Sequence, residues 1–545
     1  MKQLPIGVQD FKSIRNKDKY FVDKSMLIGQ ILDSNDDGAF LYTRPRRFGK
    51  SLNLSMMDAF FNIEYKGNTW FDDLEISKHH EYDGYKNAFP VLYIDMKPVC
   101  ADNYDDFSED FICLVEDAYK KYQYLNDSPN LTDIDKIGFS DVCLGKISPR
   151  ESKIAFVRLT NLLEKHHGKK VIVLIDEYDS VISSVTDVDV RRKILSFMKG
   201  VYSSLLKGNE SLQMGVITGV MQITKENIFS GLNNLVVNNI FTKRSDEMFG
   251  FTDDEVEQIC VDYGHPEKFA EAKEWYDGYR FGNADIYNPW SILNYVENGF
   301  EPAPYWVNTS GNSVIDDLMI NVNEDMLKDL ETLGSGGSVE RNISMTVTFD
   351  DLARKPGAIY SLMAMAGYLK AVESDGGYLL SIPNRELFLV FADAVILSAF
   401  DNDDVSSSMG RFSKAIISND TAKMESALYG VIVNTLSSRV LDNEHSYQAF
   451  IVGMLMALSG RYRITADFES GKGYHDIRME SKDGKGCNVI MELKRSNGES
   501  QLEQDARKAI QQIREKDYAH DLKGQTILYG ISFYGKVPHI VSEKL

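Results

Sequence analysis

The sequence predicts an α/β protein with a parallel sheet in its first part, a mostly helical middle and a smaller α/β unit at its C-terminus. Short apolar runs rich in β-branched residues recur in the first part, and the longer amphipathic segments between them suit crossover helices. These runs fade after about residue 300 and return after about residue 440. The strands expected in the first part are residues 39–43, 89–96, 169–176 and 213–220.

The middle and the C-terminal unit have patterns of their own. In the middle, the apolar stretch AIYSLMAMAGYLKAV is expected to be helical and to lead into a hairpin at 378–384. In the C-terminal unit, a hairpin turn is expected at SKDGKG. The expected elements around it are strands at 463–469, 474–481, 486–494 and 525–535 and an amphipathic helix at 500–518.

A chain of 545 residues is too long for one compact core, and its length alone suggests about three domains. Its composition, 43% hydrophobic and 26% charged, is that of an ordinary globular protein. The polar stretch DNDDVSSSMG at 401–410 predicts a break within a helical connector. The expected units are residues 1–300, a lid at 301–395, the connector at 396–440 and a last domain at 441–545.

The charge and the apolar runs restrict the partners. A net charge of −21 disfavours indiscriminate binding to nucleic acid. Residues 461–545 are nearly neutral, with 15 basic and 13 acidic side chains. The N-terminus has no apolar stretch that could serve as a signal peptide, and the longest apolar run, 449–458, is about half of a membrane span. We therefore expect a cytoplasmic protein with no membrane partner, and a buried helix at 449–458.

The stretch TRPRRFGKS at 43–51 predicts a phosphate-binding loop between a strand and a helix. Such a loop normally opens with glycine, and Arg44 stands in that place. Backbone amides at the helix N-terminus can bind phosphate, the lysine can reach the β and γ phosphates, and the serine hydroxyl can hold Mg²⁺. The alternative is a chance Gly-Lys-Ser at the start of a helix. The candidate ATP-binding residues are Arg46, Arg47, Phe48, Gly49, Lys50 and Ser51.

A second signal is VIVLIDEYDSVI, in which an apolar strand ends in Asp176 and Glu177. An acidic residue at a strand's C-terminal end beside the loop can hold Mg²⁺ and its water shell, and the adjacent carboxylate can orient the attacking water. Asp176 and Glu177 fit these two roles. Thr218, at the end of the next strand, stands where a polar residue could sense the γ phosphate. The alternative is a buried strand with a solvated acidic end.

The C-terminal unit carries a second group of candidate residues. Alternation along the strand places Glu492 and Lys494 on one face, and Asp476 comes from the preceding strand across the hairpin turn. Two carboxylates can hold Mg²⁺ or Mn²⁺, which activates water, and a lysine can stabilise the developing charge. Glu444, at the start of a helix, is an accessory candidate. The alternative is an incidental Glu-x-Lys on an exposed hairpin.

The chain resembles a bacterial AAA-ATPase-like family whose members commonly end in a domain of the PD-(D/E)XK nuclease superfamily. The resemblance extends from residue 7 to nearly the C-terminus. It is carried by GVQDFKSIRNKDKYFVDKSMLI, RPRRFGKS, FPVLYIDMK, VLIDEYDS, IFSGLNNL, MFGFTDDEV, WYDGYRFGNADIYNPWSIL and YWVNTSGN. An arginine-rich loop is usual in that family, which implies that Arg44 is compatible with an ATP site.

The resemblance implies further features. It implies a P-loop NTPase fold, a winged-helix-like lid with 378–384 as its wing, and a restriction-endonuclease-like C-terminal domain. His475 replaces the proline of the nuclease motif, and Gln512 matches a polar helix position that some members of the superfamily add to the site. An arginine acting on the γ phosphate is expected in this class. Lys225, Lys243, Arg244 and Arg280 are equal candidates.

Two functions follow from these signals. In the first, the chain is an ATPase coupled to a Mg²⁺-dependent nuclease that acts on DNA or RNA. In the second, it is a nucleotide-dependent switch whose nuclease-like domain recognises nucleic acid or another partner without cutting. The intact set of Asp476, Glu492 and Lys494 favours the first, and the acidic net charge favours the second. The sequence does not choose between a monomer and an oligomer.

Overall fold

A computed structural model gives the fold of the chain. Its described residues form two compact units, one of residues 1–306 with 340–384 and one of residues 307–339 with 385–545. The residues described are 1–34, 38–99, 103–185, 187–221, 228–229, 234–306, 326, 329, 332–333, 336–344, 357–388, 403–435, 444–455, 458, 462–470, 473–482 and 486–545.

The first unit is built on a five-stranded sheet with the strand order β2-β3-β4-β1-β5. Every recorded pair in this sheet is parallel. The four expected runs are all strands, whereas β5 was not expected because its four residues give too short a pattern. The strands are β1 (Ala39–Thr43), β2 (Val91–Asp95), β3 (Val171–Asp176), β4 (Leu212–Gly219) and β5 (Leu235–Asn238).

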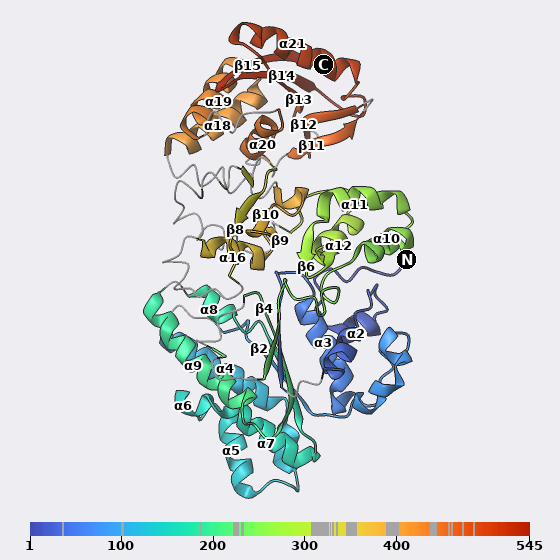
Figure 1. Ribbon diagram of the computed structural model, residues 1–545, viewed down its shortest axis with the longest axis vertical. Helices are drawn as coiled ribbons and strands as arrows, with labels where there is room; N and C mark the ends of the chain where they lie inside the picture. Colours follow the sequence, from blue (N-terminus) through green and yellow to red (C-terminus); the bar gives the residue numbers. More distant parts are fainter. Residues whose placement is uncertain are drawn as a thin grey trace. The chain divides into compact units, whose positions relative to one another are not determined.

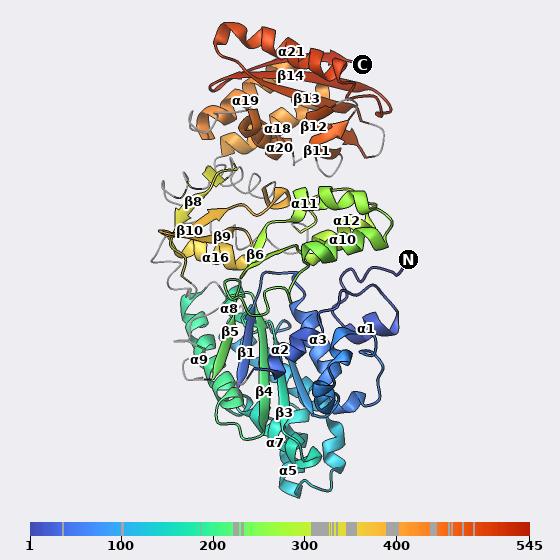
Figure 2. The same cartoon turned by 45° about the vertical axis from the view of Figure 1, so that its right-hand side comes forward.

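Helices cover both faces of this sheet (Figure 1). Val171, Val173 and Ile175 of β3 pack into the core with residues of α4 (Tyr104–Lys120), α7 (Ala155–His167) and α9 (Val188–Leu206). Helix α3 (Lys50–Phe61) contacts β2, β3 and β4 and lies on the opposite face (Figure 2). All six residues of β3 are buried, as a parallel strand covered on both faces requires.

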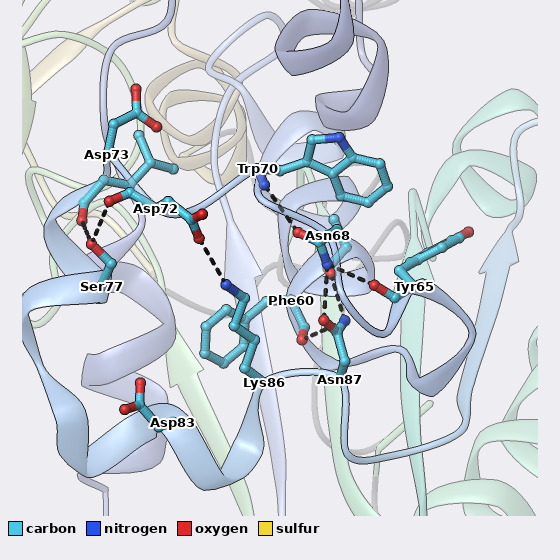
Figure 3. A network of polar contacts seen from close by, with 12 residues as sticks. Phe60, Tyr65, Asn68, Trp70, Asp72, Asp73, Ser77, Asp83, Lys86 and Asn87 are labelled. Atoms are coloured by element: carbon cyan, nitrogen blue, oxygen red, sulfur yellow. Dashed lines mark hydrogen bonds and ion pairs between the residues drawn. The ribbon is translucent and has the colours of Figure 1, made fainter.

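The far end of α3 is fastened by an asparagine network (Figure 3). Asn87 has a left-handed backbone, with φ of 53°, and its amide donates to the carbonyl oxygens of Ala59, Phe60 and Asn62 at 2.9–3.2 Å. Asn68 donates to the side-chain oxygen of Asn87 at 2.8 Å. These bonds satisfy carbonyls that a helix end leaves without partners. They tie α3 to the chain that leads into β2.

Shorter elements complete the first unit, with 3-10 turns at Ile63–Tyr65, Glu75–Lys78 and His80–Tyr85. The other helices are α1 (Phe11–Asn16), α2 (Met26–Leu32), α5 (Asp133–Cys143), α6 (Pro149–Ser152), α8 (Ser180–Ser184), α10 (Asp253–Asp262), α11 (Phe269–Tyr276), α12 (Pro289–Glu297) and α16 (Ala358–Ala366). The other strands are β6 (Tyr279–Phe281), β7 (Ala284–Ile286), β8 (Val339–Arg341), β9 (Lys370–Ser374) and β10 (Gly377–Ser381).

The lid segment differs from the expected helix in its second half. Helix α16 ends at Ala366, where Gly367 adopts the left-handed cap conformation with φ of 88°. Residues 370–372, expected to be helical, lie in β9, which pairs with β10, the strand in which the expected wing begins. The expectation of one helix through to Val372 is therefore wrong. The apolar residues of this stretch fit both the helical period and the strand period. The helix ends at the glycine cap, and pairing with β10 makes the following residues a strand.

In the second unit, three helices precede the sheet: α18 (Asp403–Ser418), α19 (Thr421–Thr435) and α20 (Glu444–Leu455). The break expected at 401–410 is wrong from Asp403 onward, where α18 begins. Acidic residues favour a helix N-terminus, and Phe412 and Ile416 bury the later turns in the core, so tertiary packing outweighs the weak propensity of the serines. Within the described residues, no helix has the length and apolar character needed to cross a bilayer.

A mixed sheet in the order β11-β12-β13-β14-β15 completes this unit. Only β13 and β14 pair in parallel, because α21 (Leu502–Glu515) crosses over between them. Val489, Met491 and Leu493 pack toward α18, α19 and α20, whereas Ile490 packs against α21. The strands are β11 (Tyr462–Ser470), β12 (Gly473–Ser481), β13 (Asn488–Arg495), β14 (Thr526–Tyr534) and the unexpected β15 (Val537–Lys544).

Candidate functional site

The loop after β1 places Lys50 at the carboxyl edge of the parallel sheet. The chain turns there through left-handed conformations at Arg47, with φ of 71°, and at Gly49, with φ of 81°. The Lys50 ammonium is buried and donates to the carbonyl oxygens of Arg44 and Pro45 at 3.0 and 2.9 Å. Its burial lowers the pKa of Lys50, and nearby carboxylates act in the opposite direction. Ser51 follows in the first turn of α3.

Arg44, which replaces the usual glycine, is buried and joins the loop to a distant segment of the chain. Its side chain is fully buried and donates to the carbonyl oxygens of Thr43, Asn238 and Ser245 at 2.9, 2.9 and 3.3 Å. The guanidinium also lies 5.0 Å from the ring centroid of Phe249. Burial lowers the pKa of Arg44 to about 10. The arginine therefore fixes the start of the loop to the chain that follows β5.

The next loop residues pack against aromatic side chains from the stretch WYDGYRFGNADIYNPWSIL. Phe48 is fully buried, with ring centroids 4.9 Å from Tyr279 and 5.1 Å from Phe281. The guanidinium of Arg47 lies 4.2 Å from the ring centroid of Trp290. These aromatic side chains therefore pack against the loop. Because the Phe48 side chain is buried in these contacts, only its backbone is available to bind nucleotide.

The lid segment also touches the loop. Gly367 packs so closely on Pro45 that a Cβ atom there would lie 2.8 Å from the Pro45 Cβ. The indole of Trp306 donates to the carbonyl oxygen of Arg46 at 3.4 Å, and its ring lies 5.0 Å from that of Tyr368. The side chain of Arg46 itself is exposed. Within the first unit, the loop and the lid therefore form one packed body.

The acidic strand end lies beside this loop. Asp176 is buried, and its Oδ1 accepts hydrogen bonds from the Thr218 hydroxyl and, at 3.1 Å, from the backbone amide of Glu177. Strand β4 lies between β1 and β3, which brings Thr218 between the loop and Asp176. Glu177 has φ of 49°, a left-handed conformation that costs energy for a residue with a side chain.

Sequence reasoning missed two carboxylates at this edge. Asp95 pairs with Asp176 across β2 and β3, and burial raises its pKa, as does the Asp176 charge. The sequence pattern that could have identified Asp95 is the one that identified Asp176, an apolar strand ending in aspartate. Asp179 is buried, and burial raises its pKa to about 6 although it accepts amide hydrogen bonds. No sequence signal marked Asp179, because its partners come from a distant segment.

The four candidate cations differ in their placement. Arg280 forms an ion pair with Asp285 at 3.1 Å, and Arg244 donates to the carbonyl oxygen of Gln30 at 3.0 Å. Lys243 follows β5 in the first unit. Lys225 lies outside the described residues. The choice among these residues therefore stays open.

The second candidate site lies on the α21 face of the C-terminal sheet. Strands β12 and β13 pair antiparallel up to Ile477 and Met491, and Asp476 and Glu492 are the next residues of the two strands. The Asp476 carboxylate accepts the backbone amide of Leu493 at 2.6 Å. Lys494 lies 3.3 Å from Glu492 Oε1, and the Gln512 amide of α21 donates to the same oxygen. The structure thus brings the four residues Asp476, Glu492, Lys494 and Gln512 together.

Glu492 is a buried carboxylate with a raised pKa. It is 1% exposed, and burial, with the Asp476 charge as a second cause, raises its pKa to about 8. Its Oε2 is buried without a hydrogen-bond partner among the described residues. A buried carboxylate oxygen of this kind is costly, and a divalent cation is one partner that removes the cost. The donor set of two carboxylates suits Mg²⁺, which usually keeps several waters.

Two further residues, Gly530 and Gln448, shape this site. A Cβ atom at Gly530, which pairs with Glu492, would lie 2.0 Å from the Ala506 carbonyl oxygen, so glycine lets α21 approach the sheet. Gln448 of α20 donates to the Asp476 carbonyl oxygen at 2.7 Å. Glu444 is the first residue of α20, but its side chain lies outside the described part of the chain.

His475, which stands at the proline position of the nuclease motif, is buried, and burial lowers its pKa to about 4. A neutral imidazole beside Asp476 adds no charge to the site. Across the described residues, no cluster of three or more His, Cys, Asp or Glu side chains forms a metal cage.

Comparisons with known proteins agree with this division. Residues 5–229 match the family model described as Predicted AAA-ATPase, and residues 442–543 match that of the PD-(D/E)XK nuclease superfamily. A relative in Azotobacter chroococcum mcd 1, an uncharacterized protein in the vnfD 5' region, is 26% identical over 404 residues, which are 73% of this chain and 70% of the relative.

Among solved structures, a Signal Transduction ATPase with Numerous Domains from Pyrococcus horikoshii, which has a tetratricopeptide repeat sensor, is 13% identical. The match covers 81% of this chain and 58% of that one, with a TM-score of 0.24, which is too low to support a comparison of folds. The two family matches carry the assignment. The chain has a predicted AAA-ATPase-like domain at residues 5–229 and a PD-(D/E)XK nuclease superfamily domain at residues 442–543.

Proposed function

We propose that the chain binds and hydrolyses ATP with Mg²⁺ in its first unit, and that its C-terminal domain is a metal-dependent nuclease acting on DNA or RNA under nucleotide control. The observation that carries the ATPase assignment is the meeting of buried Lys50, Asp176 and Thr218 at the carboxyl edge of one parallel sheet. Ligands of open α/β sheets bind at this edge.

In the proposed ATP site, the amides at the start of α3 bind phosphate oxygens, and Lys50 exchanges its loop carbonyls for the β and γ phosphates. Ser51 and Asp176 hold the ion, with Asp176 kept in place by Thr218. Bound Mg²⁺ supplies neutralisation of the charge that develops on the phosphates. Glu177 orients the attacking water and accepts its proton.

In the proposed nuclease site, Asp476 and Glu492 hold Mg²⁺ or Mn²⁺. Glu492 Oε2, which has no hydrogen-bond partner among the described residues, is the oxygen that would bind the ion. Bound metal supplies an activated water and a Lewis acid for the phosphodiester. Lys494 orients that water or stabilises the developing charge. Gln512 holds Glu492 in its rotamer through Oε1. Nucleic acid is the substrate because the metal and lysine chemistry suits a phosphodiester.

A second candidate function is a nucleotide-dependent switch that binds nucleic acid without cutting it. The observation that favours it is the near-neutral charge of residues 461–545, since dedicated DNA-binding domains are usually clearly basic. The pKa of Glu492 near 8 also means that its carboxyl holds a proton at neutral pH without a cation. Cleavage assays separate the two functions.

Replacing Lys50 with alanine should weaken Mg·ATP binding by roughly 10- to 100-fold, because a charge-assisted contact to phosphate is lost. Glu177→Gln should keep binding and lower turnover by about 10²- to 10⁴-fold, the usual contribution of a general base. Titration with a fluorescent ATP analogue and phosphate release measure the two effects. The exposed Lys169→Ala serves as the control. Unchanged binding and turnover in both site variants would refute the ATP site.

Wild-type chain should cut labelled nucleic acid only with Mg²⁺ or Mn²⁺, and Asp476→Ala should lose at least about 100-fold in rate because it removes a metal ligand. The assay covers single- and double-stranded DNA and RNA, each with and without ATP. Glu503→Gln, an exposed carboxylate on α21, is the control and should cut normally. Absence of cutting on every substrate, with ATP hydrolysis intact, would favour the switch.

The stability of the chain should depend on pH through Glu492. Its pKa is raised to about 8, so the folded state keeps a proton that the unfolded state releases near the ordinary value of 4.5. Stability from this group is therefore lost as pH rises from about 4.5 to about 8. In chelator, Glu492→Gln should raise the melting temperature relative to wild type at pH 8.5, and by less at pH 6.

Added Mn²⁺ should reverse this order at pH 8.5 by raising the melting temperature of the wild type and not that of Glu492→Gln, since the ion binds the ionised carboxylate. Thermal melts of the full chain provide the measurement. A Gln variant that is equally destabilised at both pH values, with no metal effect in either protein, would count against a metal site at Glu492.

A further inference from the structure

Two segments at the carboxyl edge of the first sheet are joined by hydrogen bonds that involve Asp179. The Asp179 carboxylate accepts the backbone amides of Val220 at 3.0 Å and Met221 at 2.7 Å. One residue earlier, the amide of Tyr178 donates to the Thr218 carbonyl oxygen at 3.0 Å. The chain after β3 is therefore fixed to the chain after β4 over several consecutive residues.

This junction is tightly packed. Asp179 is 3% exposed, and a Cβ atom at position 219 would lie 2.5 Å from Asp179 Oδ1 and 2.5 Å from Cε1 of Tyr178. Glycine at 219 is therefore needed for the close approach. A buried carboxylate is retained only where its hydrogen bonds offset the loss of hydration, and two backbone amides serve that purpose here. Lys50 adds a favourable charge to the surroundings of Asp179.

The strained residue Glu177 lies inside this junction. On its N-terminal side, the Asp176 carbonyl oxygen accepts the amide of Met96 at 3.1 Å, and the Asp176 carboxylate accepts the Thr218 hydroxyl. On its C-terminal side stand the bonds of Tyr178 and Asp179. Glu177 is thus held in its left-handed conformation, with φ of 49°, from both sides. Strain of this kind persists only where the surroundings fix it.

We propose that Asp179 is a positioning residue for ATP hydrolysis. By holding the amides of Val220 and Met221, it keeps the Glu177 backbone in the left-handed conformation and so aims the Glu177 carboxylate at the attacking water. This inference rests on the proposed ATPase function. Asp179 itself touches neither nucleotide nor water in this scheme, and its effect passes through Glu177.

The test is Asp179→Asn in the full chain. Asparagine has nearly the same shape, but it carries no charge, and both amides donate to one oxygen, Asp179 Oδ2. With the asparagine oxygen in that place, its amide nitrogen faces the Val220 amide, which also lies 3.3 Å from Oδ1, so the clamp is weakened by lost charge and by this donor–donor contact. We expect kcat to fall by about 10-fold to 100-fold, with Kd for Mg·ATP within about twofold of wild type, as for an interaction made only in the transition state. Asp187→Asn is the control, because exposed Asp187 also accepts two amides, at the start of α9.

A double-variant measurement separates positioning from general stability. If Asp179 acts through Glu177, then adding Asp179→Asn to Glu177→Gln should lower single-turnover hydrolysis by less than about threefold further. A full additional loss, or wild-type kcat in Asp179→Asn alone, would overturn the inference. A wild-type chain that neither binds nor hydrolyses ATP would overturn the proposed function as well, so the two failures are distinguishable.

Hydrogen exchange on the wild-type chain covers the case in which Asp179→Asn does not fold. The Val220 and Met221 amides should exchange at least about 100-fold more slowly than unprotected amides, because both are bonded to a buried carboxylate. Exchange of both amides at the unprotected rate would contradict the clamp and overturn the inference without any variant.

Discussion

The buried guanidinium of Arg44 is the constraint on which the first unit depends. Burying a cation is costly unless its donors find partners, and the two terminal nitrogens of Arg44 donate to the carbonyl oxygens of Thr43, Asn238 and Ser245, whereas its Nε is buried without a partner among the described residues. It fixes the start of the phosphate loop, and the loop carbonyls in turn hold Lys50. The Arg44 side chain thus fixes the entry to the loop, whose shape in an ordinary phosphate loop depends on the flexible backbone of a glycine. Aromatic residues of the lid complete the packing around the loop.

Both candidate sites contain a buried carboxylate on a strand that accepts a hydrogen bond from a neutral side-chain donor. Thr218 holds Asp176, and Gln512 holds Glu492. In each case an inserted element brings the donor close: β4 between β1 and β3, and α21 against a glycine of β14. A divalent cation would relieve the cost of burying Glu492 Oε2, which supports the metal dependence proposed for the C-terminal site.

The sequence predicts these meeting points because carboxyl ends of parallel strands share one edge and alternate residues of a strand share one face. Lys50, Asp176 and Thr218 were found in this way, as were Glu492 and Lys494. Asp179 and Gly530 were not, since their partners are distant in sequence and only tertiary packing brings them close. The helix at 403–418 was missed for a related reason, because buried contacts sustain a segment whose local residues favour a turn.

The central claim is that a loop with arginine in place of its first glycine is a working ATP site. Calorimetric binding of Mg·ATP to wild type and to Arg44→Gly tests it most directly. If Arg44 fixes the entry to the loop, restoring the ordinary glycine lowers the melting temperature and weakens binding at least about 10-fold, since buried charge-assisted bonds are lost. Equal or tighter binding by Arg44→Gly with an unchanged melting temperature would contradict the account, as would a wild-type chain that binds no ATP.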